Sequence, residues 1–127
     1  MTEVVLDASA LLALIFREPG HEQVEQRLSD SVISAANLSE VATRLVRRGA
    51  DDQDIREILA GVGVPPVPVD QDIALQAAAM HRETAALGLS LGDRLCLATA
   101  QAHGLPAVTA DRAWQGLQVA VQVVCIR

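Results

Sequence analysis

The sequence contains no lysine and no tyrosine, and its only aromatic residues are Phe16 and Trp114. The absence of lysine excludes a Walker A phosphate-binding loop and any Schiff-base or lysine-nucleophile chemistry. The scarcity of aromatic residues argues against stacking platforms for single-stranded bases. The two cysteines, Cys96 and Cys125, form no CxxC motif, so we expect two buried cytosolic thiols and neither a zinc site nor a disulfide framework.

Acidic residues outnumber basic ones, 16 against 10 arginines, and give a formal net charge of −6. This balance argues against a protein that holds nucleic acid on a broad basic face. The longest apolar run spans residues 10–16, far short of the roughly 20 residues that cross a bilayer. The first three residues carry no basic side chain, and Asp7 interrupts the apolar stretch that follows, which does not suit a signal peptide. We therefore expect a cytoplasmic protein with no membrane partner.

A chain of 127 residues, half of them hydrophobic, is expected to form a single domain over 1–127. Short apolar and β-branched runs predict strands at 4–6, 31–34, 107–109 and 119–126, with another near a sheet edge within the proline-rich stretch 62–69. Helical patterns cover 8–17, 22–28, 37–48, 51–59, 70–87 and 90–103. Strands that alternate with helices imply parallel pairing and an α/β sandwich.

Four acidic residues lie at or just after a predicted βα junction or in the first turn of a predicted helix: Asp7, Glu40, Asp93 and Asp111. Each also has an ordinary structural interpretation. Asp7 suits the N-cap of the following helix, and Asp111 suits a turn or cap. Asn37-x-x-Glu40 and Ser90-x-x-Asp93 both fit a capping box, in which the acidic side chain accepts a backbone N–H.

Together, the four positions indicate a common site. In a parallel α/β sheet, the strand carboxyl ends and the helix N-termini share one edge, where such sheets bind ligands. Crowded carboxylates repel one another, and a bound Mg²⁺ or Mn²⁺ relieves that repulsion and prefers oxygen ligands. Because no cysteine or histidine accompanies the four acids, magnesium fits better than zinc, and it typically works on phosphate oxygens.

The segments around these acids resemble those of PIN-domain proteins. Residues 4–13 (VVLDASALLA) look like the opening strand and helix of that family, and residues 37–41 (NLSEV) look like its second acidic motif. Residues 91–98 (LGDRLCLA) and 108–114 (VTADRAW) look like the third and fourth motifs. The order and spacing are similar to those of the small members, the VapC toxins of bacterial toxin–antitoxin pairs, over essentially the whole chain.

The resemblance implies a three-layer α/β/α sandwich around a mainly parallel sheet of about five strands. It also implies a Mg²⁺- or Mn²⁺-dependent endoribonuclease, in which Asp7, Glu40 and Asp93 are the core metal ligands. Asp111 would bind a second ion or act through water. Such a site activates water for attack on an RNA phosphodiester, and the expected products carry a 5′-phosphate and a 3′-hydroxyl.

Several residues near the acids have candidate supporting roles. Ser9 and Thr109 match small hydroxyl positions beside the family's site. Arg94 and Arg112 each directly follow a proposed site acid, and either contact with RNA phosphates or a local ion pair explains them. The remaining arginines near the predicted motifs are expected to be surface charges, with contacts at the rim of the site as the alternative: Arg17, Arg44, Arg47 and Arg48.

The resemblance further implies a cognate VapB-like antitoxin and a homodimer. The apolar segment 11–16 offers a dimer surface or a groove for an antitoxin helix. Two other functions stay open: a PIN nuclease in RNA processing without an antitoxin, and a catalytically silent PIN-like module that binds partners. A haloacid-dehalogenase-type phosphatase is disfavoured, because Ser9 stands where a second aspartate is needed and the required lysine is missing.

Overall fold

β1 (Val4–Leu6) is the central strand of a five-stranded sheet in the computed structural model, which describes residues 3–127. All of its pairings are parallel, and the strand order is β3-β2-β1-β4-β5. The other strands are β2 (Ser31–Ser34), β3 (Pro66–Val67), β4 (Ala107–Thr109) and β5 (Val123–Cys125). The predicted strands are therefore confirmed, with β3 at a sheet edge and β5 shorter than the predicted 119–126. Met1 and Thr2, on which part of the signal-peptide argument rests, lie outside the described residues.

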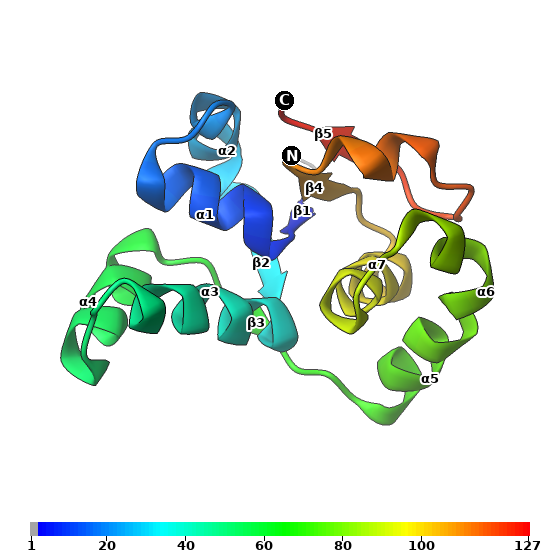
Figure 1. Cartoon of the computed structure of the whole chain (residues 1–127), viewed down its shortest axis with the longest axis horizontal. Helices are drawn as coiled ribbons and strands as arrows, with labels where there is room; N and C mark the ends of the chain where they lie inside the picture. The colour runs from blue at the N-terminus through cyan, green and yellow to red at the C-terminus, as the bar shows by residue number, and fades with distance from the viewer. Residues whose placement is uncertain (1–2) are drawn as a thin grey trace.

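Helices cover both faces of the sheet (Figure 1). On one face lie α1 (Ala8–Phe16), α2 (His21–Arg27), α3 (Ala35–Arg47) and α4 (Asp52–Val62). On the other lie α5 (Gln71–Ala79), α6 (His81–Thr84) and α7 (Leu91–His103). Three short 3-10 helices complete the described chain: η1 (Leu28–Asp30), η2 (Ala85–Leu87) and η3 (Arg112–Gly116). Within residues 3–127, no helix combines the length and the hydropathy that a membrane span requires.

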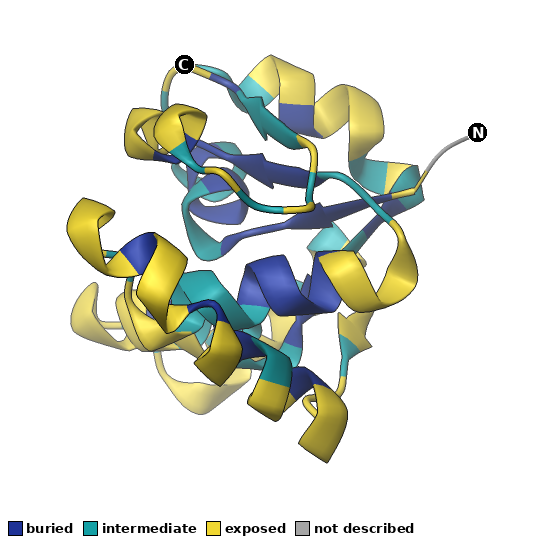
Figure 2. Cartoon of the chain, turned by 90° about the vertical axis from the view of Figure 1, so that its right-hand side faces the viewer, coloured by how far each residue is buried: buried dark blue, intermediate teal, exposed yellow. Residues whose placement is uncertain are grey.

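The side chains of β1 alternate between two separate cores. Val4 and Leu6 pack with residues of α1, α2 and α3, whereas Val5 packs with residues of α5 and α7. All three are at most 1% exposed, as expected for a parallel strand that is covered on both faces. Figure 2 shows the buried strands between helices whose outer faces are exposed. The three-layer α/β/α sandwich is thus confirmed.

The predicted continuous helix over 70–87 is wrong, because the chain breaks into α5, α6 and η2. The break lies at Met80, which is 2% exposed. The hydroxyl of Thr84 donates to the Met80 carbonyl at 2.9 Å, and the Thr84 N–H donates to the same oxygen at 3.1 Å. A hydroxyl that shares the carbonyl four residues earlier bends a helix.

Gly20, between α1 and α2, has a φ of +94°, and a Cβ there would overlap the Ile126 carbonyl oxygen. Gly49 has nearly the same φ of +92°, but nothing lies within 4 Å of its Cβ position. We predict that Gly20→Ala lowers the free energy of unfolding by at least about 1 kcal/mol more than Gly49→Ala. Both variants strain the backbone, and only Gly20→Ala adds a collision. Denaturant unfolding measures the difference, and equal losses would contradict the prediction.

Candidate active site

Asp7 directly follows β1 and caps α1, so its predicted role as an N-cap is confirmed. Its Oδ1 accepts the Ala10 N–H at 2.8 Å. The residue is only 3% exposed, although it lies at the carboxyl edge of the sheet, where ligands bind in folds of this kind. A single short side chain thus begins a helix and also places a carboxylate at the candidate site.

Two hydroxyl groups hold the Asp7 carboxylate. The Ser9 hydroxyl lies 2.7 and 2.9 Å from its two oxygens, and the Thr109 hydroxyl donates to Oδ2 at 2.6 Å. Both hydroxyls also accept backbone N–H groups, Ser9 from Ala110 at 2.9 Å and Thr109 from Asp111 at 3.0 Å. The end of β4 is therefore tied to the start of α1 through Asp7.

Burial raises the pKa of Asp7 from 3.8 to about 6. The negative charge of Asp93 contributes to this rise, and the hydrogen bonds from Thr109, Ala10 and Ser9 oppose it. The site therefore disfavours its own ionised carboxylate and would be stabilised by a cation.

Glu40 is held in a way that the sequence did not predict. Ser34 caps α3, and its Oγ accepts the Ala36 N–H at 3.2 Å, so the helix begins two residues earlier than expected. The predicted capping box between Asn37 and Glu40 is therefore wrong. Instead, the Asn37 amide donates to Glu40 Oε1 at 2.6 Å and to the Gly92 carbonyl at 3.0 Å.

Gly92 allows the Glu40 carboxylate to approach α7 closely. A Cβ at position 92 would overlap that carboxylate. Asn37 is 1% exposed, and its Oδ1 is buried without a hydrogen-bond partner. Asn37 and Gly92 thus position Glu40, and the sequence signals for them were an asparagine within one acidic motif and a glycine within another.

Asp93 lies in the first turn of α7, and the predicted capping box with Ser90 is confirmed. Its Oδ2 accepts the Ser90 N–H at 3.0 Å, and its own N–H donates to the Ser90 hydroxyl at 3.2 Å. Asp93 is half-buried, and its charge acts on Asp7. Its second oxygen, Oδ1, is not used by the capping box.

Cys96 lies one turn further along α7 than Asp93, and its thiol is buried. Burial raises the pKa of the Cys96 thiol well above its usual range, and the charges of Asp7, Asp93 and Glu40 add to the shift. Both cysteines are free thiols, as expected, but the expectation that both are buried is confirmed only for Cys96 and is wrong for Cys125, which is half-buried on edge strand β5.

Asp111 follows β4 and lies at the start of η3. Its Oδ1 caps η3 by accepting the Ala113 N–H at 2.9 Å, which confirms its predicted role as a cap residue. It lines a separate pocket of about 460 Å³ with Ser9, Arg112 and Arg127. Its link to Asp7 runs through the Thr109 hydroxyl.

The carboxylate oxygens of Asp7, Glu40 and Asp93 are of the type that a hard cation such as Mg²⁺ prefers, but the three side chains are not yet close enough to share one ion. Within residues 3–127, no three Asp, Glu, His or Cys side chains lie close enough together to hold a metal ion. Glu40 is exposed and Asp93 is half-buried, and the hydrogen bonds of each carboxylate use only one of its oxygens, so Glu40 Oε2 and Asp93 Oδ1 stay available to a cation. Asn37 Oδ1 adds an unpartnered oxygen beside Glu40. An all-oxygen set of this kind suits Mg²⁺ or Mn²⁺.

The two candidate RNA-contacting arginines lie in different surroundings. Arg94 donates to the Ala77 carbonyl at 3.0 Å, and this contact joins α7 to α5. It makes no ion pair with Asp93, since the ion pairs of the described chain are His21–Glu22 and Arg127–Glu18. Arg112 is exposed in the Asp111 pocket.

Comparison with solved structures supports the same fold. A toxin–antitoxin complex from Klebsiella pneumoniae contains a chain that is 24% identical, with a TM-score of 0.77 and 98% of each chain covered. VapC20 from Mycobacterium tuberculosis, described as a Sarcin–Ricin loop cleaving toxin, is 20% identical, with a TM-score of 0.72 and coverage of 94% of this chain and 99% of that one. VapBC-5 from the same organism gives 25% identity, a TM-score of 0.63 and coverage of 100% and 99%.

A search of curated protein sequences found no match. The family model described as "PIN domain" matches residues 4–119, which include all four acidic residues and nearly all of the described sheet and helices. The resemblance seen in the sequence is therefore confirmed at the level of the family and of the VapC-like toxin fold. By this match, and by the fold that it shares with toxins of VapBC pairs, the chain belongs to the PIN-domain family.

Proposed function

We propose that this chain is a Mg²⁺- or Mn²⁺-dependent endoribonuclease and the toxin of a VapBC-type toxin–antitoxin pair. The observation that carries the proposal is the buried Asp7 carboxylate at the carboxyl edge of the sheet, held by the hydroxyls of Ser9 and Thr109. Similarity to VapC20, which is described as a Sarcin–Ricin loop cleaving toxin, supports a cleaving toxin.

The proposal assigns a role to each acid. Asp7, Glu40 and Asp93 hold the ion, and Asp111 binds a second ion or acts through water. When bound, the ion supplies Lewis acidity and an activated water for hydrolysis of a phosphodiester. Ser9 and Thr109 fix the Asp7 carboxylate at distances of 2.6–2.9 Å.

The partners follow from the structures that this chain is similar to. Some of these are toxin–antitoxin complexes, which supports a cognate VapB-like antitoxin, and from the family resemblance we infer a homodimer as well. Leu11, from the apolar segment 11–16, lines a groove of about 240 Å³ with Leu38, Leu59 and Val64. This groove suits the apolar face of an antitoxin helix.

Asp7→Asn is predicted to reduce metal-dependent RNA cleavage by about 100-fold or more, because it weakens a ligand that no neighbour replaces. Cleavage of labelled RNA with Mg²⁺ or Mn²⁺, with and without EDTA, measures the loss. Asp72→Asn is the matched control, since Asp72 is exposed in the first turn of α5. Full activity of Asp7→Asn, or of the wild-type chain in EDTA, would overturn the nuclease assignment.

The toxin assignment is tested separately by expression in a bacterial host. The wild-type chain is expected to arrest growth, and Asp93→Ala is expected not to. Equal growth arrest by both proteins would contradict a toxicity that depends on cleavage, whereas cleavage without any growth arrest would indicate an RNA-processing nuclease.

Gly92→Ala is predicted to lower Mg²⁺ affinity and cleavage about 10-fold, because the added Cβ displaces the Glu40 carboxylate. The fold itself should be unharmed, since alanine favours the helix by up to about 1 kcal/mol. Gly61→Ala in α4 is the control, because its Cβ would meet nothing within 4 Å. If both variants retain full cleavage, the positioning role of Gly92 is wrong.

Asp7→Asn is also predicted to stabilise the metal-free chain at neutral pH. The pKa of Asp7 rises from 3.8 to about 6 on folding, so the folded state holds a proton that the unfolded state has lost. Stability therefore falls as the pH rises between these values, and above about pH 6 the loss reaches about 3 kcal/mol.

Denaturant unfolding in EDTA measures this effect. The gain in Asp7→Asn, up to about 3 kcal/mol at neutral pH, should vanish near pH 4, where Asp7 is protonated in the folded state. Added Mg²⁺ should stabilise the wild-type chain more than the variant. A variant that is less stable than the wild type at neutral pH in EDTA would contradict the prediction.

A further inference from the structure

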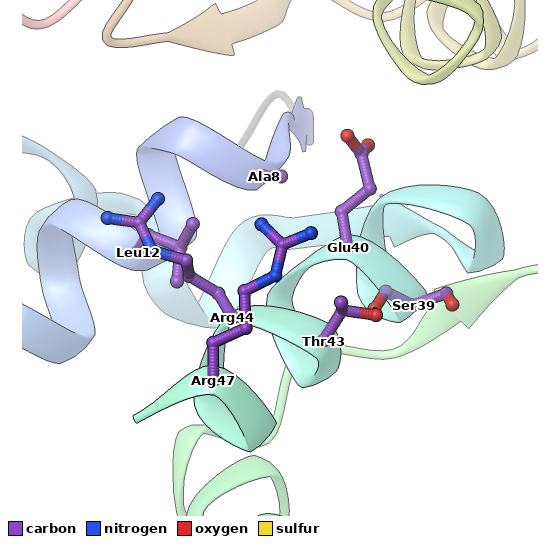
Figure 3. A pocket seen from close by; sticks show the side chains of 7 residues that line it. All are labelled: Ala8, Leu12, Ser39, Glu40, Thr43, Arg44 and Arg47. Atoms are coloured by element: carbon purple, nitrogen blue, oxygen red, sulfur yellow. The ribbon is translucent and has the colours of Figure 1, made fainter. Parts of the chain in front are cut away.

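A pocket of about 310 Å³ lies between α1 and α3 beside the acidic site. Ala8, the residue after Asp7, and Leu12 line it from α1. Its α3 side is formed by Ser39, Glu40, Thr43, Arg44 and Arg47. The pocket therefore begins at one of the proposed metal ligands and continues along α3 toward two arginines (Figure 3).

Helical spacing places Glu40, Arg44 and Arg47 on one face of α3, because they are four and then three residues apart. Along the helix axis, Arg44 lies about 6 Å beyond Glu40 and Arg47 about 10 Å beyond it. Figure 3 shows both guanidinium groups extending from α3 toward α1. This face of α3 therefore carries a negative charge, Glu40, at the acidic site and two positive charges, Arg44 and Arg47, farther from it.

The guanidinium groups of Arg44 and Arg47 form no ion pair within the described chain. Both residues are exposed. Arg48 differs, since its guanidinium lies 4.5 Å from the centroid of the Phe16 ring. Two unpaired arginines in one pocket of a chain with net charge −6 indicate a binding site for an anion.

We propose that this pocket is a phosphate subsite, in which Arg44 and Arg47 bind the backbone of a single RNA strand next to the phosphodiester held at the carboxylates. The inference rests on the proposed nuclease function and deepens it. The pocket shares Glu40 with the acidic site, so a single RNA strand can contact both the carboxylates and the arginines. This favours a nucleic acid over an acidic peptide.

The composition supports the same choice. Aromatic surface for base stacking is scarce, since Trp114 is 1% exposed and the half-buried Phe16 ring has the Arg48 guanidinium 4.5 Å from its centroid. With no tyrosine and no lysine, arginines are the cationic side chains that can contact phosphates beyond the carboxylate site. Contacts of this kind hold the strand without reading its sequence.

The test compares two double variants that change the net charge equally. One is Arg44→Gln/Arg47→Gln, and the control is Arg27→Gln/Arg82→Gln, at exposed sites on α2 and α6. Glutamine keeps the helix and much of the side-chain stem. Both carry Asp7→Asn so that the RNA stays intact. Fluorescence anisotropy with a labelled single-stranded RNA in Mg²⁺ gives Kd at several salt concentrations, and circular dichroism checks the fold.

Loss of the subsite should raise Kd at least about 10-fold at 0.1 M salt and reduce the slope of log Kd against log salt by about 1.4. The control should leave the slope unchanged. The same Kd and slope in both double variants would overturn the inference, as would an Asp7→Asn chain that does not bind RNA. If Arg44→Gln/Arg47→Gln leaves RNA binding unchanged but abolishes binding of polyglutamate, the pocket takes an acidic peptide. This result would also overturn the inference.

Cleavage by the wild-type chain separates this inference from the proposed function. With the native Asp7 restored, Arg44→Gln/Arg47→Gln is expected to raise KM about 10-fold and to change kcat little. If the wild-type chain cleaves RNA and this variant matches the control, the subsite is wrong and the nuclease assignment stands. If the wild-type chain does not cleave, the nuclease assignment fails, and the salt slope alone decides whether the arginines bind phosphate.

Discussion

Parallel pairing of β1 with both β2 and β4 is the constraint on which the acidic site depends. Because the three strands run in one direction, their carboxyl ends and the starts of α1 and α3 meet at one edge. The chain returns through α7 before β4, so α7 also begins at that edge. A shift of one residue in the β1–β4 register would turn Asp7 to the other face and break its bond to Thr109. Stability of the sheet and geometry of the site are therefore set by the same hydrogen bonds.

Features that depend on local signals could be predicted from the sequence. The strands end where apolar runs meet a polar residue, as at Asp7, and α7 begins at a Ser90–Asp93 capping box. These signals hold because each depends on a few neighbouring residues. Asp7 also shows that a capping role and a site role are compatible, since its carboxylate oxygens accept backbone and hydroxyl donors together.

Features that depend on contacts between distant segments could not be predicted. Asn37 reaches Gly92 across 55 positions, and Arg94 reaches back to the Ala77 carbonyl on α5. Either residue taken alone has an ordinary interpretation, as a helix cap or as a phosphate contact. The break at Met80 was missed for a related reason, because a buried threonine hydroxyl overrides the strong helix propensity of the alanine-rich segment. Tertiary packing decides such positions.

The two cysteines, Cys96 and Cys125, differ in how accessible and how reactive their thiols are. The Cys96 thiol is fully buried, and burial is the main cause of its raised pKa, to which the nearby carboxylates add, so it is a poor nucleophile toward alkylating agents and oxidants. Cys125, on edge strand β5, is the accessible thiol of the pair. A maleimide dye or a spin label would therefore attach at Cys125, which pairs in register with Thr109 at the end of β4, so the label would lie at the edge of the sheet that carries the acidic site. The natural sequence thus provides a single attachment point for reporters of assembly.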